Sequence, residues 1–169
     1  MAIREVCLLG DPVLRRKAAQ VQTVTPEVRA LIADMFDTMY AEDGVGLAAP
    51  QIGVSERILV IDTREDGSTP IALVNPVLVE ASEETEKEDE GCLSLPGLND
   101  IVERSLRVIV NGLDREGKPQ RIEAEGLLAR ALQHELDHID GILFIDRVSP
   151  LKRQMLLKKW RKVKPVGDG

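Results

Sequence analysis

The stretch Gln133-His134-Glu135-Leu136-Asp137-His138 contains both histidines of this 169-residue chain. On a helix, residues four apart lie about 40° apart around the axis and one turn apart along it, so two imidazoles at this spacing can reach one metal ion. Glu135 projects at a different angle, which suits a proton carrier beside a metal-activated water. The pattern H-E-x-x-H therefore predicts that His134 and His138 are metal ligands and that Glu135 is an acid or base.

The residues around this motif have the periodicity of a helix. Apolar residues recur at helical spacing from Leu127 to Asp140, and Gly141 follows, where helices commonly end. The motif by itself occurs by chance in ordinary helices. Here, however, one side of the expected helix combines the motif with apolar positions, which predicts that the histidines face the interior. That side consists of Leu127, Ala131, His134, Glu135 and His138.

Two histidines do not complete a catalytic site of the zinc type, which takes three protein ligands and leaves one position for water. In metzincin proteases a third histidine follows the motif, but this chain has Phe144 there, and phenylalanine cannot bind a metal. A general metallopeptidase is therefore the less favoured alternative. Cys92 is the candidate third ligand, because Gly91 beside it lets the backbone approach a site closely.

The second thiol, Cys7, opens an alternative of a different class. Cys7, Cys92, His134 and His138 would together make a closed, four-ligand structural zinc site. We give this alternative less weight, because Cys7 lies in an apolar run without turn residues and is well explained as a small buried hydrophobe. Glu135 would also have no purpose in a closed site.

A second glycine-containing stretch is Gly44-Val45-Gly46-Leu47-Ala48-Ala49-Pro50-Gln51. Taken alone, it is more typical of a turn between a helix and a strand than of a binding site. It has neither the glycine spacing nor the lysine of a phosphate-binding loop. Its small residues would nevertheless let the backbone run close to a ligand, and Gln51 offers an amide donor.

Together these segments resemble the peptide deformylase family. The resemblance rests on Gly44 to Gly53, on Glu90-Gly91-Cys92-Leu93-Ser94-Leu95-Pro96, and on Gln133 to His138, which occur in the family's order and at its separations. It extends over nearly the whole chain to Ser149-Pro150-Leu151-Lys152. The resemblance implies a hydrolase that removes the formyl group from the N-terminal formyl-methionine of nascent proteins. It also implies that one divalent metal is held by Cys92, His134 and His138.

The same resemblance implies roles for further residues. Gln51 and the backbone N–H of Leu93 would stabilise the oxyanion, while Glu90 and Arg104 would brace the cysteine loop; from sequence alone, both could equally be solvated surface charges. Arg130 stands where other members can carry an apolar residue. The expected substrate-binding residues are Val45, Gly46, Gly91, Leu127 and Ala131. Fe²⁺ is the implied native ion, and the ligand set also suits Zn²⁺, Ni²⁺ or Co²⁺.

Composition limits the remaining possibilities. The hydrophobic content of 43%, the charged content of 30% and the length predict one catalytic domain, residues 1–169, with a core built mostly from aliphatic residues. Only four residues are aromatic, so few side chains could stack on nucleic-acid bases, and DNA is not an expected partner. Two cysteines without a disulfide pattern, and no signal-peptide or membrane-spanning run, predict a cytoplasmic protein without membrane association.

The order of elements predicts an α+β fold in which antiparallel β-sheets pack around the central helix that bears the histidines. Thr25 and Pro26 predict the start of an N-terminal helix that ends near Ala41. The turn signals are Asp66-Gly67, Asn75-Pro76 and Glu116-Gly117. The predicted strands are Ile58–Ile61, Ile71–Val74, Val77–Val79, Leu106–Val110 and Arg121–Ala124.

Charge is distributed unevenly along the chain. The net charge is −7, and the acidic run from Glu80 to Glu90 is most simply a solvated face. The C-terminal helix, expected over about 149–164 before a frayed tail at 165–169, is instead basic: Lys152, Arg153, Lys158, Lys159, Arg161, Lys162 and Lys164. The resemblance implies that such a helix can dock on the ribosome. A catalytically inactive ribosome-binding relative is disfavoured, because Glu135 and Gln51 are both present.

Overall fold

The computed structural model describes residues 2–163. Helix α1 spans Pro26–Ala41, and the Thr25 side chain before it accepts a hydrogen bond from the Val28 N–H over 3.2 Å. Pro26 occupies the first helical position, where no backbone N–H is needed. The predicted start and end of this helix are confirmed. Its apolar residues are buried: Val28, Leu31, Ile32, Met35 and Met39.

Residues 2–163 contain two more helices and three short 3-10 turns. α2 spans Leu127–Ile139, α3 spans Pro150–Val163, and the turns are η1 (Pro12–Arg15), η2 (Ala49–Ile52) and η3 (Phe144–Asp146). The strands are β1 (Gly46–Ala48), β2 (Ile58–Ile61), β3 (Ile71–Ala81), β4 (Thr85–Gly91), β5 (Asn99–Ser105), β6 (Arg107–Leu113) and β7 (Pro119–Glu125). None of the described helices combines the length and the apolar composition that crossing a bilayer requires.

The strands form two antiparallel sheets. Five of them pair in the order β1-β2-β3-β6-β7, and β4 and β5 form a separate two-stranded sheet. In β4–β5 the register places Glu90 opposite Asp100 and Gly91 opposite Asn99. Strand β4 ends at Gly91, immediately before Cys92, so the position of the cysteine depends on the pairing of two strands.

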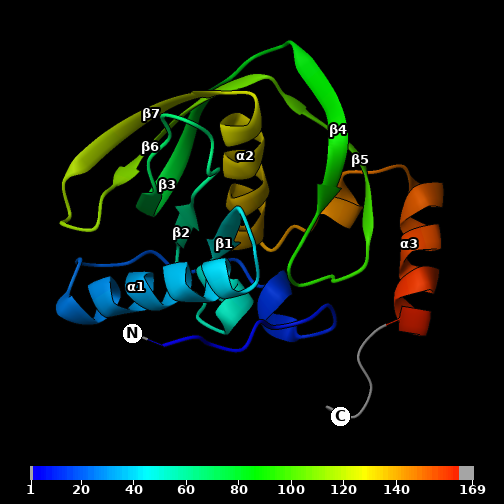
Figure 1. The fold of residues 1–169 in the computed structure, drawn as a ribbon, viewed down its shortest axis with the longest axis horizontal. Coiled ribbons are helices and arrows are strands. Elements are labelled where there is room, and N and C mark those ends of the chain that lie inside the picture. Colours follow the sequence, from blue (N-terminus) through cyan, green and yellow to red (C-terminus); the bar gives the residue numbers. More distant parts are fainter. Residues whose placement is uncertain (1, 164–169) are drawn as a thin grey trace.

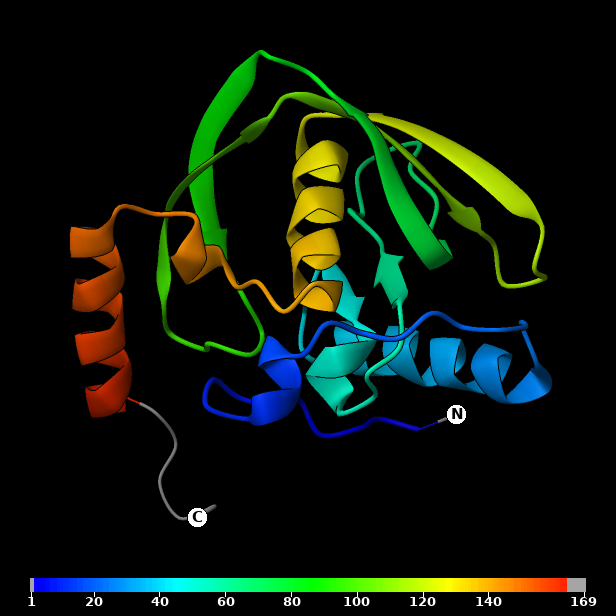
Figure 2. The same cartoon turned by 180° about the vertical axis from the view of Figure 1, so that it is seen from behind.

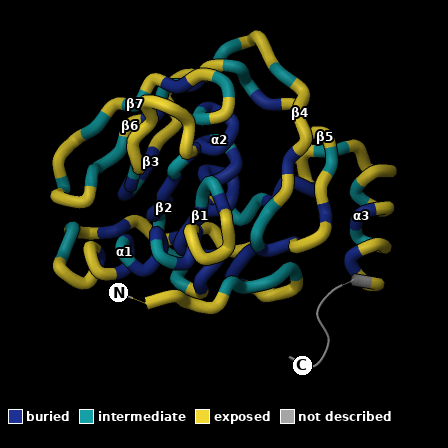
Figure 3. The backbone as a smooth tube through the Cα atoms, viewed as in Figure 1, coloured by how far each residue is buried: buried dark blue, intermediate teal, exposed yellow. Residues whose placement is uncertain are grey.

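Helix α2 stands between the two sheets, as the opposite views of Figures 1 and 2 show. One side of it packs on the five-stranded sheet in a core that includes Leu132, Leu136, Leu59 and Val110. Helix α1 packs in a second core with β1 and β2. Most of α2 is buried (Figure 3). The predicted α+β fold, with antiparallel sheets around the helix that carries both histidines, is confirmed.

The predicted turn at Asn75-Pro76 is wrong. β3 continues through both residues, so the two strands predicted on either side are one strand. Its pairing with β6 shifts register between Val74 and Val77, a bulge that tolerates a proline without a donor. Asn75 has a φ of 52°, and its side chain bonds the Val21 N–H and C=O over 2.8 Å each. Long-range side-chain contacts thus hold a turn-like residue within a strand.

The hairpin β4–β5 and the short strand β1 were not predicted. β4 contains most of the acidic run and is largely exposed, as expected for a solvated face, but Glu90 at its end is buried. The lack of an apolar/polar alternation explains why the strand signal is weak in this segment. Strand β4 is stabilised by pairing with β5 rather than by burying one whole face.

Helix α3 lies at the outer edge of the molecule, beyond the hairpin (Figure 1). Leu156 and Trp160 on one side of it are buried in a third core that also contains Leu95 and Leu98. The predicted basic residues from Lys152 to Lys162 lie on this helix. Lys164 and the predicted frayed tail at 165–169 lie outside the described residues. The helix is therefore packed against the same core that supports the loop after Cys92.

Candidate metal centre and substrate pocket

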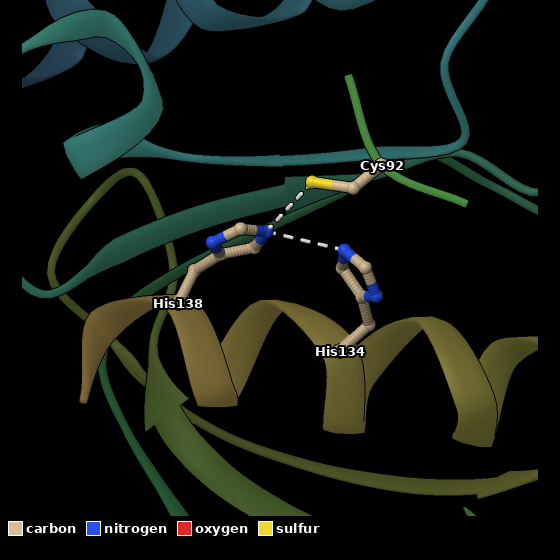
Figure 4. Close-up of side chains that lie close together, drawn as sticks. All are labelled: Cys92, His134 and His138. Carbon is tan, nitrogen blue, oxygen red and sulfur yellow. Dashed lines mark hydrogen bonds between the residues drawn. The ribbon is translucent and has the colours of Figure 1, made fainter. Parts of the chain in front are cut away.

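Three candidate ligand atoms converge beside α2. His138 Nε2 lies 3.2 Å from Cys92 Sγ and 3.1 Å from His134 Nε2, and all three atoms lie within 4.8 Å of one another (Figure 4). The histidines are one turn apart on α2, and the cysteine comes from the loop after β4. The local spacing of the motif and the long-range placement of the hairpin together bring a thiol and two imidazoles to one point.

The chemistry of this cluster fits a divalent cation. Thiolate and imidazole are ligands suited to Zn²⁺, Fe²⁺, Co²⁺ and Ni²⁺. Burial opposes a positive charge on His134, but Glu135, Cys92 and Glu90 outweigh it and raise the pKa of His134 well above its usual value. Burial next to His134 lowers the pKa of His138 well below its usual value, which keeps that imidazole neutral and able to bind a metal.

Glu90 orients His134 through the ring nitrogen that points away from the other two candidate ligands. The His134 Nδ1–H donates to Glu90 Oε2 over 2.6 Å, which leaves Nε2 facing His138 and Cys92. Such a carboxylate–histidine contact fixes the tautomer and the ring orientation of a metal ligand. Arg104 donates to both oxygens of Glu90, over 3.1 and 2.6 Å. Burial would raise the pKa of Glu90, but the bonds from His134 and Arg104 outweigh it and hold the pKa far below its usual range.

Glu90 and Arg104 are therefore not solvated surface charges. Their side chains are only 6% and 5% exposed, and they form an ion pair at 2.6 Å. Arg104 also donates to Asp137 over 2.7 Å, and Arg147 donates to both oxygens of Asp137 over 2.7 and 3.0 Å. This chain of ion pairs connects the hairpin to α2 and to the segment that leads into α3.

Glu135 lies beside the ligand cluster in an enclosed setting. It is 4% exposed, and its Oε1 has no hydrogen-bond partner among the described residues. Burial raises the pKa of Glu135 to about 7. A Cβ at Gly46 would lie 2.7 Å from Glu135 Oε2, so only glycine leaves room for this carboxylate. A buried carboxylate with a free oxygen and a pKa near neutrality is suited to accept and return a proton.

Gln51 directs its amide toward the same cluster. Its Oε1 accepts the Ala48 N–H over 2.9 Å, which fixes the orientation of the amide group. Its Nε2 then donates to Ser94 Oγ over 3.2 Å and lies 3.6 Å from Cys92 Sγ. Leu93 follows the cysteine, and its side chain packs so closely on Gly44 that a Cβ there would lie 2.8 Å from it. Two candidate oxyanion donors thus lie next to Cys92.

A cavity of about 490 Å³ opens onto this cluster. All five predicted substrate-binding residues line it, with Leu127 half-exposed and Ala131 buried. The lining also contains Gln51, Cys92, Leu93, His134 and Glu135. A larger hollow of about 870 Å³ lies on the other side of α2, but it contains none of the three candidate ligands. The smaller cavity is therefore the candidate substrate pocket.

The structure argues against the four-ligand alternative. Cys7 is not among the residues whose ligand atoms converge within residues 2–163. Its backbone N–H donates to Gln51 O over 2.6 Å, and its side chain packs at the edge of the third core. Burial and the neighbouring Asp11 raise the pKa of the Cys7 thiol to about 11. Cys7 is thus a partly buried thiol and not a ligand of this cluster.

Comparison with known proteins identifies the family of this chain. The family model described as polypeptide deformylase matches residues 3–154. The chain belongs to the polypeptide deformylase family. It is therefore a hydrolase of the kind that removes the formyl group from the N-terminal methionine of newly made proteins.

Similar deformylases come from diverse bacteria. A peptide deformylase of Thermodesulfovibrio yellowstonii is 51% identical over 163 residues, covering 95% of this chain and 98% of its own. A crystal structure of a Legionella pneumophila peptide deformylase has a TM-score of 0.90 at 52% identity and covers 96% of both chains. A structure of the Ehrlichia chaffeensis enzyme in complex with actinonin has a TM-score of 0.92 at 38% identity, covering 98% of this chain and 100% of its own.

Several residues around this deformylase site were not found from the sequence. Asp137 and Arg147 extend the ion pairs behind His134, and Ser94 holds the Gln51 amide. Their signal in the sequence is weak, because each is a common polar residue whose partner is distant along the chain. For Asp137, a position between the two histidines on a largely buried helix was the one available sign.

The contact between Gly46 and Glu135 leads to a first prediction. Gly46→Ala should displace the Glu135 carboxylate, because the new Cβ would lie 2.7 Å from Oε2. We expect kcat for formate release from formyl-Met-Ala-Ser to fall on the order of 100-fold, as small displacements of catalytic groups can cost this much. Metal content and thermal unfolding should stay close to those of the unmodified protein. An unchanged kcat would show that the Glu135 position does not limit the reaction.

Proposed function

We propose that this chain is a metal-dependent deformylase in which Cys92, His134 and His138 hold one divalent ion. The observation that carries the proposal is the convergence of these three ligand atoms within 4.8 Å, beside a cavity that Cys92 and His134 line. Glu135 adds a buried carboxylate oxygen without a partner at the same place. We further propose that residues 1–169 form a single catalytic domain.

The proposed mechanism assigns a task to each group of the site. A divalent ion at this position would polarise the formyl carbonyl and lower the pKa of an attacking water. Glu135 takes the proton from this water and later returns it to the leaving α-amine, and its buried Oε1, which has no hydrogen-bond partner among the described residues, is available for this task. The Gln51 amide and the Leu93 N–H donate to the oxyanion that develops on the formyl oxygen. Formate and a free N-terminus result.

We propose that the peptide binds as an extended strand along the cavity. Backbone groups of Val45, Gly46 and Gly91 would pair with it, in the manner of an added strand. Leu127 and Ala131 would contact the methionine side chain. The position of all five residues in the lining of one cavity supports this arrangement. Because the substrates are chains emerging from ribosomes, we place the reaction in the cytoplasm.

The first test concerns the proton carrier. Glu135→Gln keeps the size of the side chain but removes its ability to exchange a proton, so we expect turnover to fall about 10²–10⁴-fold. Metal content should be retained, because Glu135 is not a ligand. Formate release from formyl-Met-Ala-Ser measures the effect, and the exposed Glu123→Gln on β7 is the matched control. Normal turnover by Glu135→Gln would exclude the proposed role.

The second test concerns the metal. We propose Fe²⁺ as the native ion, with Zn²⁺, Ni²⁺ or Co²⁺ as alternatives that suit the same ligands. Cys92 is only partly buried, so a thiolate beside iron should be open to oxidation. Protein prepared without oxygen should contain about one iron per chain and lose activity in air, and Ni²⁺ substitution should protect it. An acetyl-Met peptide serves as the control for formyl specificity. Full, air-stable activity with zinc alone would contradict the iron assignment.

We also propose that the basic side of α3 docks on the ribosome. The helix has six basic residues and no acidic one over Pro150–Val163. Such a surface can bind phosphates of RNA in a salt-dependent manner although the whole chain is acidic. Truncation after Pro150 would be a poor test, because it would remove Leu156 and Trp160 from the core that also contains Leu95 and Leu98.

Charge reversal separates docking from folding. The double variant Lys158→Glu/Lys159→Glu changes two exposed side chains and leaves both buried anchors in place. We expect salt-sensitive co-sedimentation with ribosomes to weaken at least about tenfold, since the variant reverses two charges that could contact phosphates. Hydrolysis of formyl-Met-Ala-Ser should be unaffected. Lys17→Glu/Lys118→Glu makes the same charge change at two exposed lysines outside α3 and should bind normally. Equal binding of both double variants would remove α3 from the proposal.

A further inference from the structure

Arg130 is a buried cation behind the ligand cluster that has no task in the proposed mechanism. It lies on α2 one turn before His134 and is only 7% exposed. Its Nη1 donates to Glu90 Oε1 over 3.0 Å and to the Val102 carbonyl over 2.9 Å, and its Nη2 donates to the Glu86 carbonyl over 2.6 Å. One guanidinium thus holds the Glu90 carboxylate and the backbone of both strands of the β4–β5 hairpin.

With Arg130 included, each oxygen of Glu90 accepts two hydrogen bonds. Arg104 Nε and Arg130 Nη1 donate to Oε1, and Arg104 Nη2 and His134 Nδ1 donate to Oε2. A carboxylate held at both oxygens cannot rotate without breaking charge-assisted bonds, which are about twice as strong as neutral ones. The direction in which Glu90 accepts from His134 is therefore fixed by two arginines and not by one.

The two arginines hold Glu90 from different elements. Arg104 lies on β5, in the same hairpin as Glu90, and reaches α2 through Asp137, three residues after His134. Arg130 lies on α2 itself, four residues before His134. The hairpin is therefore fastened to the helix on both sides of the His134 imidazole. In this chain the planar guanidinium of Arg130 makes contacts that a single ammonium could not make together, to the carboxylate and to two strands.

We propose that Arg130 is a positioning residue that, by fixing Glu90 against α2, sets the orientation of the His134 imidazole and thereby the affinity of the site for its metal. The inference rests on the metal site of the proposed function. Arg130 also lines the substrate cavity, so a direct contact with the peptide is the competing role. Its observed donors are directed to Glu90, Val102 and Glu86, which favours the positioning role.

The test uses the Zn²⁺-loaded full chain, because zinc is diamagnetic and its affinity can be measured by chelator competition. Arg130→Met keeps a long apolar side chain and leaves Glu90 paired with Arg104, so a folded protein is expected. We expect zinc affinity to fall about tenfold, the lower end of the range for residues that support metal ligands. The zinc affinity of Arg130→Lys should lie between those of Arg130→Met and the unmodified protein. Arg130→Lys decides the question if Arg130→Met does not fold. Arg121→Met, at a half-exposed arginine on β7, is the matched control.

A spectroscopic measurement distinguishes positioning from simple support of the fold. The chain has only two histidines, so ¹⁵N-histidine labelling gives two imidazole spin systems. The His134 Nδ1–H signal should be protected from exchange in the unmodified protein and in Arg121→Met, and should exchange faster in Arg130→Met. The KM for formyl-Met-Ala-Ser should change less than the zinc affinity.

The outcomes separate this inference from the proposed function. If the unmodified protein binds no metal, the proposed metal site fails and this inference fails with it. If the unmodified protein binds zinc but the Arg130 variants bind it within about twofold with an unchanged Nδ1–H signal, only the positioning role is overturned. A rise in KM at unchanged zinc affinity would assign Arg130 to the peptide instead, and a lower melting temperature alone would make it a structural residue.

Discussion

The Glu90 carboxylate is the acceptor on which the geometry of the site depends. It is buried at the end of β4, and it receives hydrogen bonds from one histidine and two arginines. A buried charge is tolerated only when it is paired and hydrogen-bonded, and removal of one partner commonly costs about 3–5 kcal/mol. Loss of Glu90 would leave two buried guanidinium groups without their shared acceptor. The same carboxylate thus keeps the hairpin on α2 and directs the His134 ring.

This arrangement explains why the site is assembled from a helix and a hairpin. The helix sets the separation of His134 and His138 by its pitch alone, and the proposed third ligand comes from another element. The hairpin supplies Cys92 from the opposite side, and its register is fixed by backbone pairing from Thr85 to Gly91. Ion pairs between the two elements then join this largely polar hairpin to the helix.

The sequence predicted those parts of the site that depend on local spacing. Helical periodicity sets the separation of His134 and His138, and a short-range hydrogen bond sets the start of α1 at Thr25. The bulge at Asn75 could not be predicted from local spacing, because that residue is held by Val21, 54 positions away. Neither could the strand character of the acidic run, which comes from pairing with β5. The ion pairs of Asp137 and Arg147 could not be predicted either, because the residues next to them in the sequence do not indicate which distant residue pairs with them.

Helix α3 combines an apolar and a basic side, and the two have different consequences. Leu156 and Trp160 bury against the core that holds Leu95 and Leu98, in the loop that follows Cys92. Any surface bound by the exposed lysines would therefore be held in a fixed orientation to the cavity, because the helix cannot turn without exposing its two anchors. Flexible basic tails lack this property. The docking proposed for α3 would therefore set the orientation of the cavity relative to the surface that binds the helix, because the buried side of α3 fixes the direction of its charged side.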